Sequence, residues 1–388
     1  MTSRAPAGEG RPFVLQSTLE MVPHIERICD AAHLAPSRDN LQPWRFEVDF
    51  ETISFVVDEA RDATPMNAGG RMARIAVGAA VECALLRAGR MGATVRFPPP
   101  RPGALVTLVI TAPRRFPEPD KALVRRTTNR RVYDGRPLAD ETVATLRSKT
   151  PDLDGVRTLW FGRERVRVLG PIVEEGEALF YSDPLLRDAA LRAVRFDVRD
   201  REEVTRGLSV GSLELSGPER LTLDSLRKTP QDRLVAMGAF RKMGARARRL
   251  VESASGVCVV VARGSSAETD VAVGRCMQRA WLALTRLDLA AHPMSSIAAL
   301  EAIADEASQA AQTGETHAAE GEPGLADPVT AMRASFRAAF PNVERSSRIA
   351  LLMRFGTAAA PSSRVGRVPV SESVSEPARA GDPEGSEL

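Results

Sequence analysis

The sequence predicts an α+β fold made of two duplicated halves, each an antiparallel sheet with helices packed on it. Three observations predict it: short runs of alternating apolar residues, two helical runs that are apolar nearly all round, and the same order of elements in each half. We expect the first half to span residues 14–115 and the second half to span residues 120–368.

The first half is predicted to begin with a helix over residues 17–34, where apolar side chains recur at helical spacing until Pro36. A loop follows, with the sequence APSRDNLQPW. Two alternating runs come next, WRFEVDF and TISFVVD, and predict a hairpin. Residues 74–91 predict a helix buried on most sides, because they are apolar nearly all round. Two last strands are predicted at ATVRF and ALVTLVITA, separated by the turn-forming PPPRPG.

The second half repeats this plan. Asp140 can cap a helix through Leu146, strands are predicted at RTLWFG and SGVCVVVARG, and residues 271–287 predict a second buried helix. When the two buried helices are aligned without gaps, identical residues coincide: Val77-Gly78, Ala84, Leu86 and Arg90 fall on Val273-Gly274, Ala280, Leu282 and Arg286. The matches indicate an ancestral duplication, although shared alanine-rich composition can also produce matches of this kind.

Two stretches of the second half have no counterpart in the first. Residues 180–250 carry many arginines and the turn-like run GLSVGSLELSGPER, which indicates either a lid over a binding site or a solvated helical outgrowth. Residues 306–328 and the tail 369–388 are polar, rich in Pro and Gly, and short of large apolar groups. We therefore predict that both are disordered.

Composition excludes several kinds of partner. The 388 residues include 53 basic and 50 acidic side chains, so the net charge of +3 gives no single-signed field for nucleic acid or a membrane surface. The N-terminus lacks the apolar core of a signal peptide, and no apolar run approaches the roughly 18 residues of a membrane span, so we expect a cytoplasmic protein. The four cysteines lack the paired spacing of a metal site and are expected to be buried free thiols.

Polar groups that could bind a ligand gather in the loop between the first helix and the first strand. Ser37, Asn40 and Gln42 offer hydroxyl and amide groups for the edge of a planar heterocycle or for a polyol. The neighbouring prolines stiffen the backbone that presents them. A purely structural turn would need fewer specific polar groups, so this loop is a candidate binding element.

Arginines mark two further places. In residues 125–131, RRTTNRR, guanidinium groups and hydroxyls alternate, and arginine binds phosphate in a bidentate manner, so the cluster is a candidate dianion site. Such a run can also be a solvated surface segment. A last strand is predicted at RIALLMRF, and Arg364 and Arg367 follow it and could face the same phosphate.

Together these three places resemble the nitroreductase superfamily of FMN enzymes. The loop matches A-P-S-x-x-N-x-Q-P-W, and Arg126-x-Thr128-x-Arg130 matches the Arg-x-Ser/Thr-x-Arg element that holds the flavin phosphate in that superfamily. The register beginning at Arg125 would place Asn129 where the second arginine is expected. The resemblance implies these FMN-binding residues: Pro36, Ser37, Arg38, Asn40, Gln42, Arg126, Thr128, Asn129, Arg130, Pro293, Met294, Ser295, Arg364 and Arg367.

The distribution of these motifs over the chain implies one site. In the superfamily, each FMN usually takes its phosphate ligands from one subunit of a dimer and the Pro-Ser-x-x-Asn loop from the other. Here the loop lies in the first half and the phosphate elements lie in the second, while the matching position of the second half, LRSKTPDLDGVRTLWF, lacks the motif. The chain therefore resembles a fused, internally duplicated subgroup that includes the Acg-like proteins, and it could be a monomer or a homodimer.

The resemblance implies an FMN-dependent oxidoreductase, in which NAD(P)H or another donor reduces the flavin and an electron-poor small molecule such as a nitroaromatic or a quinone reoxidises it. Two alternatives remain: an FMN-dependent dehydrogenase of a biosynthetic intermediate, and an FMN storage protein with little turnover under a closed lid. No catalytic side chain is predicted, because the reactive atom belongs to the cofactor. His33 and His292 adjoin apolar runs and are expected to be packed and locally hydrogen-bonded.

Overall fold

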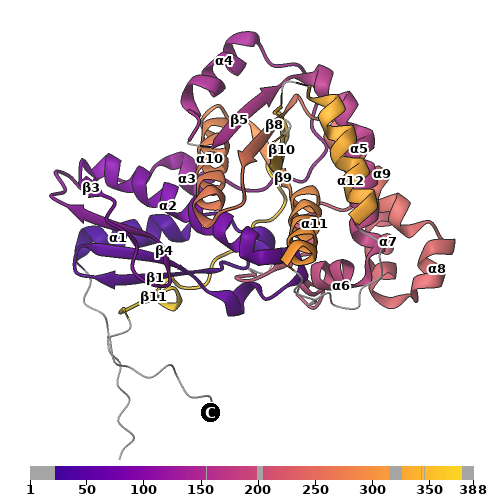
Figure 1. Cartoon of the computed structure of the whole chain (residues 1–388). Helices are drawn as coiled ribbons and strands as arrows, with labels where there is room; N and C mark the ends of the chain where they lie inside the picture. Colours follow the sequence, from indigo (N-terminus) through magenta and orange to yellow (C-terminus); the bar gives the residue numbers. More distant parts are fainter. Residues whose placement is uncertain are drawn as a thin grey trace, which may run out of the picture.

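The computed structural model describes residues 22–153, 155–198, 204–313, 326–341, 343–344 and 346–377. Its α+β architecture has two main sheets with helices between and around them, and the long helices α2 and α10 lie in the centre (Figure 1). The predicted fold class, two antiparallel sheets with packed helices, is confirmed. None of the helices in these ranges is long and apolar enough to cross a membrane.

The first half builds one sheet around a buried helix. Its strands are ordered β1-β2-β4-β3, and each neighbouring pair in this series is antiparallel. The elements are α1 (Pro23–His33), β1 (Trp44–Asp49), β2 (Thr52–Val57), α2 (Arg71–Met91), β3 (Thr94–Arg96) and β4 (Ala104–Thr111), with short 3-10 turns η1 (Arg38–Asn40), η2 (Glu59–Asp62) and η3 (Pro65–Gly70). Because residues 17–21 lie outside the described residues, the predicted first helix is seen from Pro23 onward.

The second half repeats this topology. Its strands are ordered β5-β8-β10-β9, again antiparallel throughout, with α10 following β8 as α2 follows β2. The common elements are α3 (Lys121–Arg125), α4 (Asp140–Lys149), β5 (Val156–Phe161), β8 (Gly256–Arg263), α10 (Ala267–Arg286), β9 (Ala290–Met294) and β10 (Ser347–Gly356). Helix α4 begins at Asp140 itself, and no side chain caps it.

The additional elements of the second half fall at two connections that are short in the first half. Between β5 and β8 lie α5 (Arg163–Ser182), α6 (Pro184–Arg192), β6 (Val194–Arg195), β7 (Leu208–Ser209), η4 (Gly211–Leu213), α7 (Gly217–Lys228), α8 (Gln231–Ala236) and α9 (Ala239–Glu252). Between β9 and β10 lie α11 (Ser295–Thr313) and α12 (Ala326–Ala339). Within the predicted insertion, α9 packs along α5 and buries apolar residues such as Phe240 and Leu250.

The two halves meet where α2 crosses α10, and two glycines allow the contact. A Cβ added at Gly78 would lie 2.1 Å from the carbonyl oxygen of Val271, and one added at Gly274 would lie 1.9 Å from that of Ile75. In the sequence alignment Gly78 matches Gly274, and Ile75 matches Val271, so the two contacts are the same contact seen from either half. Reciprocal contacts of this kind are a property of two-fold symmetric interfaces.

Two predictions of disorder are wrong for part of their length. Helix α11 continues to Thr313 and α12 begins at Ala326, so residues 306–313 and 326–328 are helical; residues 314–325 lie outside the described residues. The C-terminal segment forms η5 (Val370–Glu372) and then β11 (Val374–Ser375), which pairs in parallel with β1 at the edge of the first sheet (Figure 1). Its order comes from backbone pairing and from the burial of Ser373, which polar composition does not reveal.

Candidate anion-binding pocket

A pocket of about 360 Å³ lies where the three places singled out in the sequence meet. The first half contributes five residues of the segment 34–40 after α1, Arg38 not among them. The second half contributes six residues of the segment 123–130, Asn129 not among them, together with Leu208 and Ser212 from the insertion and residues 363–367 after β10. The pocket is therefore assembled from both halves.

Four arginines line this pocket without a carboxylate partner. Among the residues that the structure describes, no aspartate or glutamate oxygen lies within 4.0 Å of a guanidinium nitrogen of these four. Each arginine donates instead to a main-chain carbonyl: Arg126 to Leu34 at 3.1 Å, Arg130 to Ser212 at 3.0 Å, Arg364 to Arg125 at 3.0 Å and Arg367 to Ala35 at 2.9 Å. Asp39 also lines the pocket and attracts Arg130, but its ion pair is with Arg38, so the four guanidinium groups lack an ion-pair partner in the described part of the chain and favour an anionic ligand.

Arg126 is the most confined of these cations. Its residue is 9% exposed, its guanidinium lies over the ring of Trp281 at 4.5 Å, and its Nε is a buried donor without a partner. Burial, and next the neighbouring Arg367, lower the pKa of Arg126. Because arginine stays protonated in proteins, the same two effects make the charged group unfavourable until an anion approaches. The Nε of Arg367 is likewise buried without a partner.

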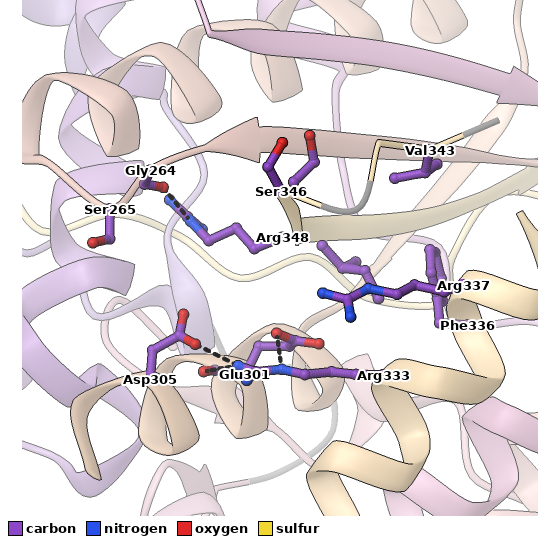
Figure 2. A pocket seen from close by; sticks show the side chains of 12 residues that line it. Gly264, Ser265, Glu301, Asp305, Arg333, Phe336, Arg337, Val343, Ser346 and Arg348 are labelled. Carbon is purple, nitrogen blue, oxygen red and sulfur yellow. Dashed lines mark hydrogen bonds and ion pairs between the residues drawn. The ribbon is translucent and has the colours of Figure 1, made fainter. Parts of the chain in front are cut away.

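In a second pocket, of about 400 Å³, arginines are instead paired with carboxylates (Figure 2). It lies beside α11 and α12, and arginines line it too. Arg333 reaches both Glu301, at 2.7 Å, and Asp305. Arg348 donates to the carbonyl of Gly264 and pairs with Asp270. These two cations are paired with carboxylates, whereas the four arginines of the first pocket form no ion pair with the residues that the structure describes.

The loop after α1 is held in an unusual backbone conformation. Asp39, Asn40 and Gln42 have φ values of 48°, 59° and 56°, in the left-handed region that side chains other than Gly rarely adopt. The Ser37 hydroxyl accepts a hydrogen bond from the backbone amide of Gln42 at 2.9 Å. That hydroxyl can still donate its own proton, and Ser37 lines the pocket. A strained backbone persists only where surrounding contacts hold it.

The sequence-predicted residues divide into those that the structure brings to this pocket and those that it does not. The residues at the pocket are Pro36, Ser37, Asn40, Arg126, Thr128, Arg130, Arg364 and Arg367. The residues that do not line it are Arg38, Gln42, Asn129, Pro293, Met294 and Ser295.

The six residues outside the pocket have other partners. Arg38 turns away into the first half, where it bonds Asp62 and Thr64. Asn129 donates to the carbonyl of Ala359 at 2.8 Å, next to a bridge between Thr128 and Ala291. Residues 293–295 form the end of β9 and the start of α11, with the first two paired to β10. Cofactor roles predicted for them have no support from this pocket.

Sequence reasoning missed several lining residues. Asp39, Thr127, Leu208, Ser212 and Ser363 also line the pocket. Asp39 and Thr127 lie inside the predicted motifs, at positions where the motif accepts any residue. Ser212 lies in the turn-like run of the insertion, which drew attention as a possible lid but has no spacing that points to particular residues. The two histidines have local partners: His33 bonds the carbonyl of Val368 at 2.7 Å, and His292 accepts from Arg354 at 3.1 Å.

Comparison with known proteins gives distant likenesses. No protein-family model matches the chain. An uncharacterized protein of Mycobacterium tuberculosis is 26% identical over 288 residues, which are 72% of this chain and 39% of that protein, so the chain spans about two fifths of that relative's length.

The solved structures that resemble the chain include three nitroreductases. The FMN-dependent nitroreductase NfnB from Mycobacterium smegmatis, in complex with NADPH, has a TM-score of 0.34 and 16% identity and covers 66% of this chain and 96% of its own. The FMN- and NADPH-dependent nitroreductase NfnB from a Sphingopyxis strain has a TM-score of 0.35 and 15% identity, and the match covers 67% of this chain and 98% of that protein. A nitroreductase with bound FMN from Bacteroides fragilis has a TM-score of 0.30 and 10% identity, and the match covers 69% of this chain and 100% of that protein.

Proposed function

We propose that this chain belongs to the nitroreductase superfamily and is an FMN-dependent oxidoreductase whose single flavin lies in the pocket between its two halves. One observation carries the proposal: four arginines without carboxylate partners converge with the Pro-Ser-x-x-Asn loop on one pocket. The loop motif indicates the family, and arginines without carboxylate partners favour the binding of a phosphate.

The residues of the pocket fit an FMN in kind and in size. Arg126, Arg364 and Arg367 would hold the phosphate dianion, with the unpartnered Nε donors of Arg126 and Arg367 among the groups available to it. Thr128 and the Ser37 proton could serve the ribityl chain or the ring edge. The pocket volume of about 360 Å³ falls in the range of ordinary cofactor sites. When bound, FMN would supply the hydride and electron transfer chemistry.

We propose NAD(P)H as the electron donor and an electron-poor small molecule, such as a nitroaromatic or a quinone, as the acceptor. The two would use the same ring in turn, since one pocket holds the whole candidate site. The chain's own contribution would be to bind the phosphate, orient the ring and exclude water from it.

One FMN per chain follows from the asymmetry of the two halves. The loop that corresponds to residues 34–43 in the second half runs from Thr150 to Gly155, between α4 and β5. Thr150 there is spent on structural bonds, since its hydroxyl bonds the carbonyl of Leu146 and accepts from Trp160. This shorter loop offers no counterpart of Asn40 or Gln42. A fused chain of this kind could act as a monomer or form a further homodimer.

A second candidate function, FMN storage with little turnover, is favoured by one observation. The insertion reaches over the pocket: Ser212 accepts from Arg130 at 3.0 Å, and Leu208 also lines the cavity. A cover that stays closed would keep acceptors from the ring. Steady-state NADPH oxidation with menadione or a nitrofuran separates the two functions. Turnover well above that of free FMN supports the oxidoreductase, and turnover no faster than free FMN supports storage.

Titration of the purified chain with FMN tests the site itself. Replacing Arg126 or Arg367 with alanine should remove charge-assisted hydrogen bonds of roughly 1.5–3 kcal/mol each, and so weaken FMN binding at least tenfold. Arg136→Ala is the matched control, because that side chain is 85% exposed and outside the pocket, and it should bind FMN like the unchanged chain. Equal affinity in all variants would refute the phosphate assignment.

A further inference from the structure

We propose that Asn40 and Gln42 are positioning residues whose side-chain amides clasp two distant segments together and thereby fix Arg367 at the pocket. The first segment, named here the cover, is residues 204–212 of the insertion. The second, named the strap, is residues 363–377, which run from the pocket to β11. The proposal assigns these two amides a role that is distinct from contact with the flavin ring, and only its consequence for ligand affinity rests on the proposed function.

The amide of Asn40 is fully used within the chain. Its Nδ2 donates to the carbonyls of Thr205, in the cover, and Gly366, in the strap, both at 3.0 Å. Its Oδ1 accepts from the Nη1 of Arg367. An amide nitrogen has two protons, so neither is left for a ligand while these bonds hold. Asn40 is also only 4% exposed.

Gln42 lies behind Asn40 and bonds the same two segments. Its Nε2 donates to the carbonyl of Thr205 at 2.7 Å and to that of Asn40 at 3.0 Å. Its Oε1 accepts from the backbone amide of Val368 at 3.2 Å, and the residue is fully buried. The Thr205 carbonyl thus receives two side-chain amides. Cover and strap also meet directly, where Gly366 donates to the carbonyl of Val204 at 2.9 Å.

The backbone conformation of the loop also bears on the role of these two side chains. Asn40 and Gln42 both adopt positive φ, where glycine would be free of strain. Glycine would lack the amides that reach Thr205, Gly366 and Val368. The chain therefore keeps strained side-chain-bearing residues at two positions in one loop, which is the expected outcome where the side chain itself is needed.

The consequence for the pocket passes through Arg367. Its guanidinium is held by the Asn40 side chain and by the carbonyl of Ala35, from the same loop. An arginine that is already oriented loses less side-chain freedom when it binds an anion. His33 forms a second hydrogen bond to the strap, at the carbonyl of Val368, the residue after Arg367. The Asn40 side chain thus contacts Thr205 of the cover as well as Gly366 and Arg367 of the strap.

Hydrogen exchange followed by mass spectrometry, on the full chain without added flavin, tests the clasp. Gln42→Leu should make the strap amides of Gly366 and Val368 exchange about tenfold faster, because Val368 loses its acceptor and the Thr205 carbonyl loses one of its two side-chain donors. Gln42→Glu keeps an acceptor for Val368 but loses both donors. It should accelerate exchange in the cover more than in the strap, and it serves if Gln42→Leu does not fold.

The control is Gln278→Leu, which also removes a fully buried amide. The amide of Gln278 bonds Cys83 in the contact between α10 and α2, and neither residue belongs to the cover or the strap. The clasp is supported if each Gln42 variant that folds accelerates exchange in its expected segment and the control does not. Unchanged exchange in cover and strap, or the same acceleration in Gln278→Leu, would overturn it.

Affinity then connects the clasp to the pocket. Asn40→Leu should weaken binding of FMN, or of inorganic phosphate as a probe, at least threefold while Arg367 itself is intact. Affinity equal to that of the unchanged chain would overturn the link to Arg367. If the unchanged chain binds neither FMN nor phosphate, the proposed function fails, whereas the exchange result still decides the clasp.

Discussion

The crossing of α2 and α10 gives the sharpest stability prediction. In Gly78→Ala the new methyl group would lie 2.1 Å from the Val271 carbonyl oxygen, and in Gly274→Ala it would lie 1.9 Å from that of Ile75. Both obstacles are backbone atoms in helices, so the helices themselves must separate. Overpacking of this severity costs about 3 kcal/mol, and alanine returns about 1 kcal/mol of helix propensity, which leaves a net loss of about 2 kcal/mol.

Gly89→Ala is the control in the same helix, because a Cβ there would meet nothing within 4 Å. It should stabilise the chain by roughly 0.5–1 kcal/mol. Urea denaturation followed by circular dichroism measures the free energy of unfolding of all three variants. Gly78→Ala or Gly274→Ala as stable as Gly89→Ala would refute the close crossing, and with it the reciprocal contact on which the symmetry of the halves depends.

Two further predictions concern charge. FMN, or phosphate at higher concentration, should stabilise the chain by about 2.7 kcal/mol at a concentration 100 times its Kd, seen as a rise in Tm that Arg126→Ala should largely lose. Acid should destabilise it, because burial lowers the pKa of His33 from its usual 6.5 and the unfolded chain then binds more protons below that pH. The free energy of unfolding should fall from pH 6.5 towards pH 5, by at most about 1.4 kcal/mol per pH unit for this group. A pH dependence unchanged in His33→Gln would rule this cause out.

The periodicity of apolar residues predicted much of the fold. The apolar runs at 74–91 and 271–287 predict the two central helices, and short apolar runs predict most strands of the two sheets, but not β9 or β11. What periodicity could not reveal is strand order, since β4 pairs with β2 through a connection that contains α2. The common order of the two sheets supports the duplication more strongly than the few identical residues do.

Side-chain roles were less predictable than their positions. The motif located the loop, and Asn40 does line the pocket. Its side-chain amide, however, is hydrogen-bonded to Thr205, Gly366 and Arg367. These partners are more than 160 residues away along the chain, so no local pattern could indicate them. Composition likewise suggested disorder for the tail, because the pairing of β11 with β1 depends on backbone groups that every sequence has.

The most direct test of the central claim is the visible absorption spectrum of the purified chain, with the chromophore released, identified by chromatography and counted per chain. The account predicts a flavin spectrum and one FMN per chain, since one pocket combines the motif loop with unpaired arginines. Two FMN per chain would contradict the single-site assignment. A colourless chain that also fails to take up added FMN would contradict the flavin site altogether.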